Sequence, residues 1–97
     1  MSEYDKRQYN LMLDQLMKFE HGKLDLHHLL DDLRALFDGL QSADESWKKA
    51  FQAEWWTLEE VYAVALDRVQ EPLSPDTQQF VSEAVGNMKR LIARVEV

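Results

Sequence analysis

The fold of this 97-residue chain is decided by residues 42–71, SADESWKKAFQAEWWTLEEVYAVALDRVQE. Large apolar side chains recur there at intervals of three and four residues, which is the period of an amphipathic helix. These side chains are Trp47, Phe51, Trp55, Leu58, Tyr62, Leu66 and Val69. At about 100° per residue they fall in a band roughly 100° wide. We therefore expect one long helix that buries this band, and the capping-box spacing of Ser42 and Glu45 predicts its start.

Trp56 lies outside that band. It falls roughly 140° from the centre of the band, on the side that carries Lys49, Glu60 and Asp67. Exposed tryptophans are enriched as anchors in protein interfaces, since the indole ring offers a large apolar area and a polar N–H. Three interpretations stay open: an anchor for a partner, packing against the first helix or a bent second half of this helix, and no role.

Two further helices are expected before the long one. The first runs from Glu3 to Glu20, with Ser2 as its N-cap and Gly22 as its stop. The second runs from Leu26 to Asp38, with Asp25 as its N-cap and Gly39 at its end. The apolar face of the second helix consists of Leu26, Leu29, Leu30, Leu33, Leu36, Phe37 and then Leu40.

A last helix is expected to start at Ser74 and Pro75, because proline at the first helical position loses no hydrogen bond. Its apolar stripe consists of Val81, Ala84, Val85, Met88, Leu91, Ile92 and Val95. Four amphipathic helices joined by short connections predict an all-α fold, a four-helix up-and-down bundle with one long third helix. At this length the bundle is a single domain over residues 1–97.

The residue totals narrow the classes of function. The chain has no cysteine, which excludes disulfides, thiolate metal sites and a cysteine nucleophile. Met1 to Asn10 is polar rather than a secretory leader, and no apolar run reaches the ~18 to 20 residues of a membrane span. We therefore expect a cytoplasmic protein without a membrane partner.

The charge is negative and unevenly spread. The formal net charge is −7, of which residues 1–41 carry −3, residues 42–71 carry −4 and residues 72–97 carry none. Direct binding to nucleic acid is disfavoured, because it requires a clustered positive patch. A basic protein is the better electrostatic partner. The alternative is that the acids simply keep a small protein soluble.

Residues with ligand-like spacing occur only around His27, His28, Asp31 and Asp32. Adjacent histidines on a helix point about 100° apart, so they cannot both face one ion without strain. We therefore predict no metal site and no cofactor, and read these groups as solvated histidines beside carboxylates. No Gly-x-Ser-x-Gly elbow or glycine-rich phosphate loop appears, and we predict that the protein is not an enzyme.

The third helix also carries a family resemblance. WKKAFQAEWWTLEEVYA, residues 47–63, is followed by Leu66-Asp67-Arg68 and by a helix start at Leu73-Ser74, and GKLDL, residues 22–26, precedes the leucine-rich helix. Over about residues 20–92 this pattern resembles small acidic immunity proteins of bacterial contact-dependent growth inhibition systems, which are encoded beside polymorphic toxins. The resemblance implies binding to the C-terminal toxin domain of a sibling cell's effector, commonly a basic nuclease acting on RNA or DNA, and blocking of its active site.

The residues expected to bind such a toxin are chosen from the polar sides of the helices, because the family supplies no shared motif. They are Trp56, Glu59, Glu60 and Asp67 on the long helix, with Asp31, Asp32 and Asp38 as a second strip. The alternative hypothesis is a structural or assembly module that forms a homodimer through the long aromatic helix. A third hypothesis is a metal-responsive regulator that uses His27 and His28.

Overall fold

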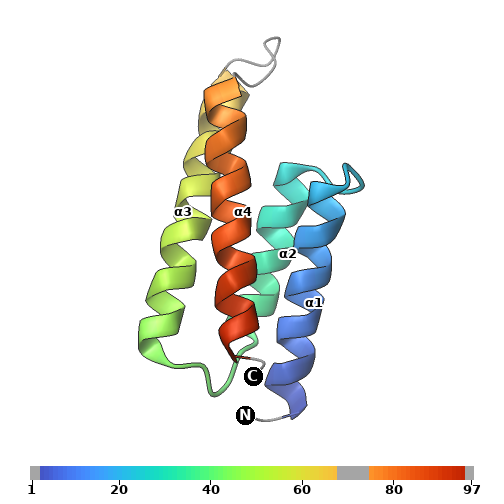
Figure 1. Ribbon diagram of the computed structural model, residues 1–97, viewed down its shortest axis with the longest axis vertical. Helices are drawn as coiled ribbons and strands as arrows, with labels where there is room; N and C mark the ends of the chain where they lie inside the picture. Colours follow the sequence, from blue (N-terminus) through green and yellow to red (C-terminus); the bar gives the residue numbers. More distant parts are fainter. Residues whose placement is uncertain (1–2, 68–74, 96–97) are drawn as a thin grey trace.

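The computed structural model describes residues 3–67 and 75–95, and for residues 65–67 it describes the backbone alone. Within these residues the chain forms four helices and no strand (Figure 1). They are α1 (Glu3–Glu20), α2 (Leu26–Asp38), α3 (Glu45–Asp67) and α4 (Pro75–Val95). The predicted all-α bundle is therefore confirmed, and α3 is the longest of the four at 23 residues.

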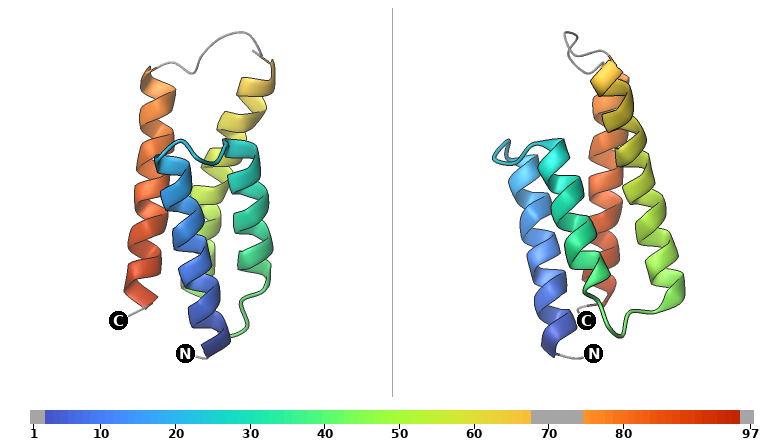
Figure 2. Two further views of the ribbon diagram at one scale, coloured as in Figure 1. Left: turned by 90° about the vertical axis from the view of Figure 1, so that its right-hand side faces the viewer. Right: turned by 180° about the vertical axis from the view of Figure 1, so that it is seen from behind.

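The helices are arranged as an up-and-down bundle in which each helix packs beside its neighbours in sequence, and α1 also packs beside α4. The short α1–α2 and α2–α3 connections force this antiparallel order. Figures 1 and 2 show that α3 and α4 extend beyond the α1–α2 hairpin at the end of the molecule opposite the start of α1. At 1.5 Å per residue, α3 is about 35 Å long and α2 is about 20 Å long, which explains the projection.

Stacked aromatic rings form part of the core near the α2–α3 connection. The rings of Phe37, Trp47 and Phe51 stack with centroids 5.2–6.4 Å apart, and Tyr9 meets Trp47 edge-on at 5.1 Å. Trp47 is buried and donates its indole N–H to the carbonyl oxygen of Leu91 at 2.8 Å, so α3 and α4 are held together there. The other fully buried apolar side chains include Met12, Leu16, Leu29, Leu33, Leu58, Val85, Met88 and Ile92.

The two ends of the α1–α2 connection use the residues expected from the sequence. Gly22 adopts a left-handed φ of 73°, its N–H donates to Phe19 and the next N–H, of Lys23, donates to Lys18. This pair of bonds is the Schellman motif, which favours glycine at that position. Asp25 caps α2, because its carboxylate accepts the backbone N–H of His28 at 2.8 Å.

The start of α3 differs from the prediction. The helix begins at Glu45, after Asp44, whose carbonyl oxygen accepts the N–H of Lys48, so the expected capping box of Ser42 with Glu45 is wrong. The hydroxyl of Ser42 donates instead to Asp5 at 2.7 Å, in the first turn of α1. Ser42 therefore fixes the connection to α1 rather than capping α3.

Candidate functional site

Trp56 is the largest exposed side chain of α3. Its side chain is 58% exposed, as its position opposite the apolar band predicted. Most large apolar side chains on the other helices are buried, and the exposed ones are scattered. An indole that stays in water on a packed helix is an unusual feature, and the side chains around it decide what it can bind.

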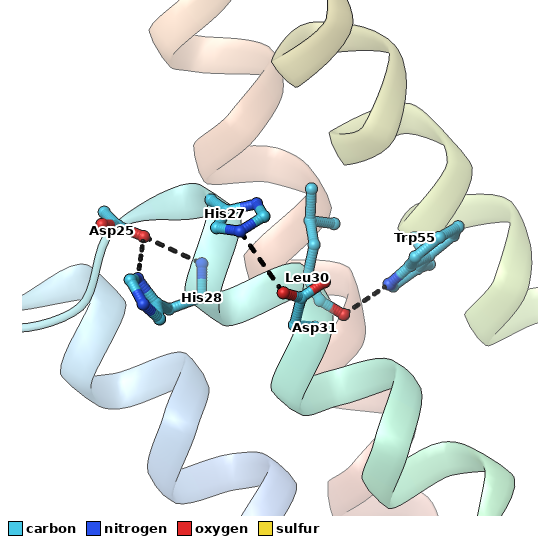
Figure 3. Close-up of polar contacts among 6 residues, drawn as sticks. All are labelled: Asp25, His27, His28, Leu30, Asp31 and Trp55. Carbon is cyan, nitrogen blue, oxygen red and sulfur yellow. Dashed lines mark hydrogen bonds and ion pairs between the residues drawn. The ribbon is translucent and has the colours of Figure 1, made fainter.

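The ring of Trp56 rests on a second tryptophan that is held in place. Trp55 is half-buried and donates its indole N–H to the carbonyl oxygen of Leu30 on α2 at 3.2 Å (Figure 3). The rings of Trp55 and Trp56 meet edge to face, with centroids 5.3 Å apart and planes at 79°. Because Trp55 is anchored across the α2–α3 interface, it gives Trp56 a fixed neighbour and limits the motion of the exposed ring.

Arg34 of α2 contacts the Trp55 ring. Its guanidinium carbon lies 5.4 Å from the centroid of the Trp55 ring, which is a cation–π contact. The same guanidinium bonds Asp38 one turn further on, with Nε and Oδ2 3.2 Å apart. A small pocket of about 90 Å³ lies between these groups, lined by Arg34, Phe37, Phe51, Gln52, Trp55 and Trp56.

Carboxylates and a second aromatic pair continue this surface toward the start of α2. Asp31 is exposed and lies 3.4 Å from Nε2 of His27 (Figure 3). The His27 ring in turn stacks on Tyr62 of α3, with centroids 5.4 Å apart and planes at 24°. The His27–Tyr62 stack and the Arg34–Trp55 contact both cross from α2 to α3, so the two helices present one continuous surface.

We call this surface the α2–α3 face. It consists of His27, Asp31, Arg34 and Asp38 on α2, and Trp55, Trp56, Glu59 and Tyr62 on α3. Glu59 is half-buried and belongs here because it lies one helical turn after Trp55 and one turn before Tyr62. Three carboxylates and one guanidinium give the α2–α3 face an excess of acidic groups.

Four of the seven nominated residues therefore lie together, and the others do not. Asp32 follows Asp31 by one position and so points about 100° away, on the side of α2 where Leu36 accepts a hydrogen bond from Gln8 of α1. Glu60 lines a different groove, between α3 and α4. The side chain of Asp67 lies outside the described residues.

The histidines of α2 take separate partners. His28 places Nδ1 2.7 Å from Asp25, whereas His27 approaches Asp31. The hydrogen bond to Asp25 and then its charge raise the pKa of His28, while the backbone N–H and then the ring of His28 lower the pKa of Asp25. Within the part of the chain that the structure describes, no group of three or more His, Cys, Asp or Glu residues is placed to hold a metal ion.

Four residues of the α2–α3 face, His27, Arg34, Trp55 and Tyr62, are not among the seven nominated residues. The sequence predicts Trp55 as core because it shares the apolar period, yet it lies at the edge of the band that faces α2 and is only half-buried. The place of Arg34 on this surface could have been predicted from the sequence, because Arg34 lies between Asp31 and Asp38 on one side of α2. Its contact with Trp55 depends on how α2 packs beside α3, which local spacing does not determine.

Comparison of this chain with protein-family models, with curated proteins and with solved structures finds no match. Among the described residues, no helix combines the length and apolar character needed to cross a membrane.

Proposed function

We propose that this chain is an immunity protein that binds a basic toxin domain through the α2–α3 face and neutralises it. The observation that carries the proposal is Trp56, which is 58% exposed and in edge-to-face contact with Trp55. Arg34, which contacts Trp55 on α2, is itself paired with the exposed carboxylate of Asp38. The family resemblance of residues 47–63 supports the same class of partner.

Trp56 has the properties of an interface anchor. Tryptophan contributes a large contact area with only two side-chain torsions, so burying it on binding costs little conformational entropy. The edge-to-face contact with Trp55 restricts the ring before binding. A pre-ordered anchor loses less entropy than a mobile one when a partner covers it, which favours affinity.

The carboxylates favour a cationic partner. Asp31 and Asp38 have side chains that are 69% and 60% exposed, so they can exchange their present contacts for an arginine or lysine of a partner. The net charge of −7 adds long-range attraction, which raises the rate of encounter with a basic protein at low salt. A basic nuclease domain presents the charge that this surface needs.

Growth protection tests the proposal. A basic toxin domain of the kind that the resemblance implies is expressed in a sensitive host with and without this chain, and we expect the chain to restore growth. Trp56→Ala and Asp31→Lys are expected to reduce protection, because the first removes the anchor and the second reverses a charge on the α2–α3 face.

Leu11→Ala is the matched control, since Leu11 is 42% exposed but lies on α1, which packs beside α2 and α4 and not beside α3. Protection lost with Leu11→Ala and kept with Trp56→Ala would contradict the proposed face, and no protection by the wild type would contradict the function. Sedimentation at several concentrations distinguishes the alternative of a self-assembling module, which requires a dimer that Trp56→Ala dissociates.

A further inference from the structure

A second exposed surface lies on the projecting end of the α3–α4 hairpin. A groove of about 320 Å³ is lined there by Thr57, Glu60, Val61, Val64, Thr77 and Phe80. Val64 is 55% exposed and Phe80 is 60% exposed, so two large apolar side chains face water across it. The α1–α2 hairpin does not extend to this end of the molecule (Figure 2).

Among the described residues, the charged side chains that line or flank this groove are all acidic. Glu60 lines it, while Asp76 and Glu83 flank Phe80 on the adjoining surface of α4. Among the described residues, no cation lies within 4 Å of these three carboxylates. In the sequence, residues 50–67 and 75–88 together contain six acids and no lysine, arginine or histidine.

Basic side chains occur nearer the C-terminal end of α4. Asn87 donates a hydrogen bond to Glu54 across the α3–α4 interface at 3.1 Å, and a separate hollow there is lined by Arg90 and Arg94 together with Glu54. The acidic, apolar section is therefore confined to the projecting end, and a ligand with its positive charge at one end would be oriented by this difference.

The charge also decides between the candidate occupants of the groove. A second copy of this chain would bring two sets of the same carboxylates together, which is repulsive. An anionic membrane surface is disfavoured for the same reason. A cationic amphipathic helix matches both properties, because its apolar side can cover the exposed side chains while its lysines or arginines meet the acids.

We infer that the groove defined by Val64 and Phe80 is a docking site for a cationic amphipathic helix of a partner protein. Its apolar residues cover these two side chains, and its basic residues pair with Glu60, Asp76 and Glu83. The site does not depend on the toxin-binding proposal, because none of the residues that line it lines the pocket between Trp55 and Arg34.

The test uses a labelled synthetic peptide of about 18 residues, built from lysine and leucine with leucine at helical spacing and long enough to form a helix. Fluorescence anisotropy measures its binding to the full chain. We expect one peptide per chain, and we expect Phe80→Ser to weaken binding about tenfold or more, as loss of an interface anchor does.

Met17→Ser is the matched control, because Met17 is a similarly exposed apolar side chain, 43% exposed, on α1. We expect it to leave peptide binding unchanged, and we expect a glutamate–leucine peptide with the same leucine positions not to bind. Circular dichroism of each variant checks that the fold is kept.

Three results would overturn the inference. The first is absent peptide binding, or binding that Met17→Ser weakens as much as Phe80→Ser does. The second is a dimer in sedimentation that Phe80→Ser dissociates, which would assign the groove to a second copy. The third is attachment to lipid vesicles that Phe80→Ser abolishes, which would assign it to a membrane surface.

Discussion

At the scale of single residues, Asp5 connects the start of α1 to the α2–α3 connection. Its side chain is fully buried, and its carboxylate accepts the backbone N–H groups of Gln41 and Ser42 and the hydroxyl of Ser42 at 2.7–2.9 Å. Burial acts to raise the pKa of Asp5, but these hydrogen bonds outweigh it and hold the pKa below its ordinary value of 3.8. The charged form is therefore the one that stabilises the fold.

We predict that Asp5→Asn lowers the free energy of unfolding by about 2 to 3 kcal/mol at pH 7, because the donors of Gln41 and Ser42 lose an ionised acceptor. A carboxyl with a depressed pKa stabilises the fold above its unfolded pKa and loses that contribution as the pH falls through its folded pKa. The difference between wild type and variant should therefore be largest above about pH 4 and shrink in stronger acid. Urea denaturation across this range measures it.

Ser42→Ala is the control for this prediction. It removes the hydroxyl bond alone and is expected to cost about 1 kcal/mol. Equal stability of wild type and Asp5→Asn at pH 7 would show that the carboxylate does not hold the connection.

His28 gives a second prediction at this scale. Its raised pKa comes first from the hydrogen bond to Asp25, so Asp25→Asn should lower the pKa of His28. Asparagine also caps helices, so α2 should keep its start. A proton NMR titration of the His28 ring measures the shift, and an unchanged pKa in the variant would refute the pairing.

The same pair makes stability depend on pH with a defined sign. A histidine whose folded pKa is raised stabilises the fold fully below its unfolded pKa of about 6.5 and loses that contribution as the pH rises through its folded value. The stability advantage of wild type over Asp25→Asn should therefore shrink on raising the pH from 6 to 8.

At the scale of elements, Gly22 and Gly86 show two different effects of glycine on stability. At Gly22 glycine permits a backbone conformation that strains other residues, and at Gly86 it adds conformational entropy to the unfolded chain. Gly22 ends α1 at a φ of 73°, and a Cβ built there meets no atom within 4 Å, so the penalty of a side chain is purely conformational. Gly86 lies inside α4, where the φ is not positive and a Cβ would make only an ordinary contact with Arg90 at 3.8 Å.

We predict opposite outcomes for the same substitution at these positions. Gly22→Ala should lower the free energy of unfolding by about 1 kcal/mol, because alanine is strained in the left-handed region. Gly86→Ala should raise it by about 0.5 to 1 kcal/mol, because glycine in a helix interior costs conformational entropy. Thermal or urea unfolding measures both, and equal signs would contradict the assigned backbone conformations.

The helix boundaries show what local sequence can predict. The predicted ends of α1 and α2 are confirmed, because Gly22, Asp25 and the apolar period determine structure within a few residues of themselves. The start of α3 was missed because Ser42 bonds Asp5, 37 positions earlier in the chain. No pattern around residue 42 reveals that partner.

At the scale of the whole molecule, the period of α3 predicted that Trp56 is exposed, but not which helices flank it. Glu59 and Glu60 are adjacent in sequence, yet Glu59 lies on the α2–α3 face and Glu60 lies in the groove toward α4. That division follows from the order of the helices around the bundle. The sequence thus predicted the bundle and its exposed indole, while the composition of each face required the packing of α3 between α2 and α4.

The three tryptophans supply the measurement that tests the central claim most directly. Trp47 is 7% exposed, Trp55 is half-buried and Trp56 is 58% exposed. Their indole N–H signals in a ¹⁵N-edited NMR spectrum therefore report on three positions of α3 that differ in burial. On titration with a basic toxin domain of the proposed kind, we predict a large shift for Trp56, a smaller one for Trp55 and none for Trp47. A complex that forms while the Trp56 signal stays in place would contradict it.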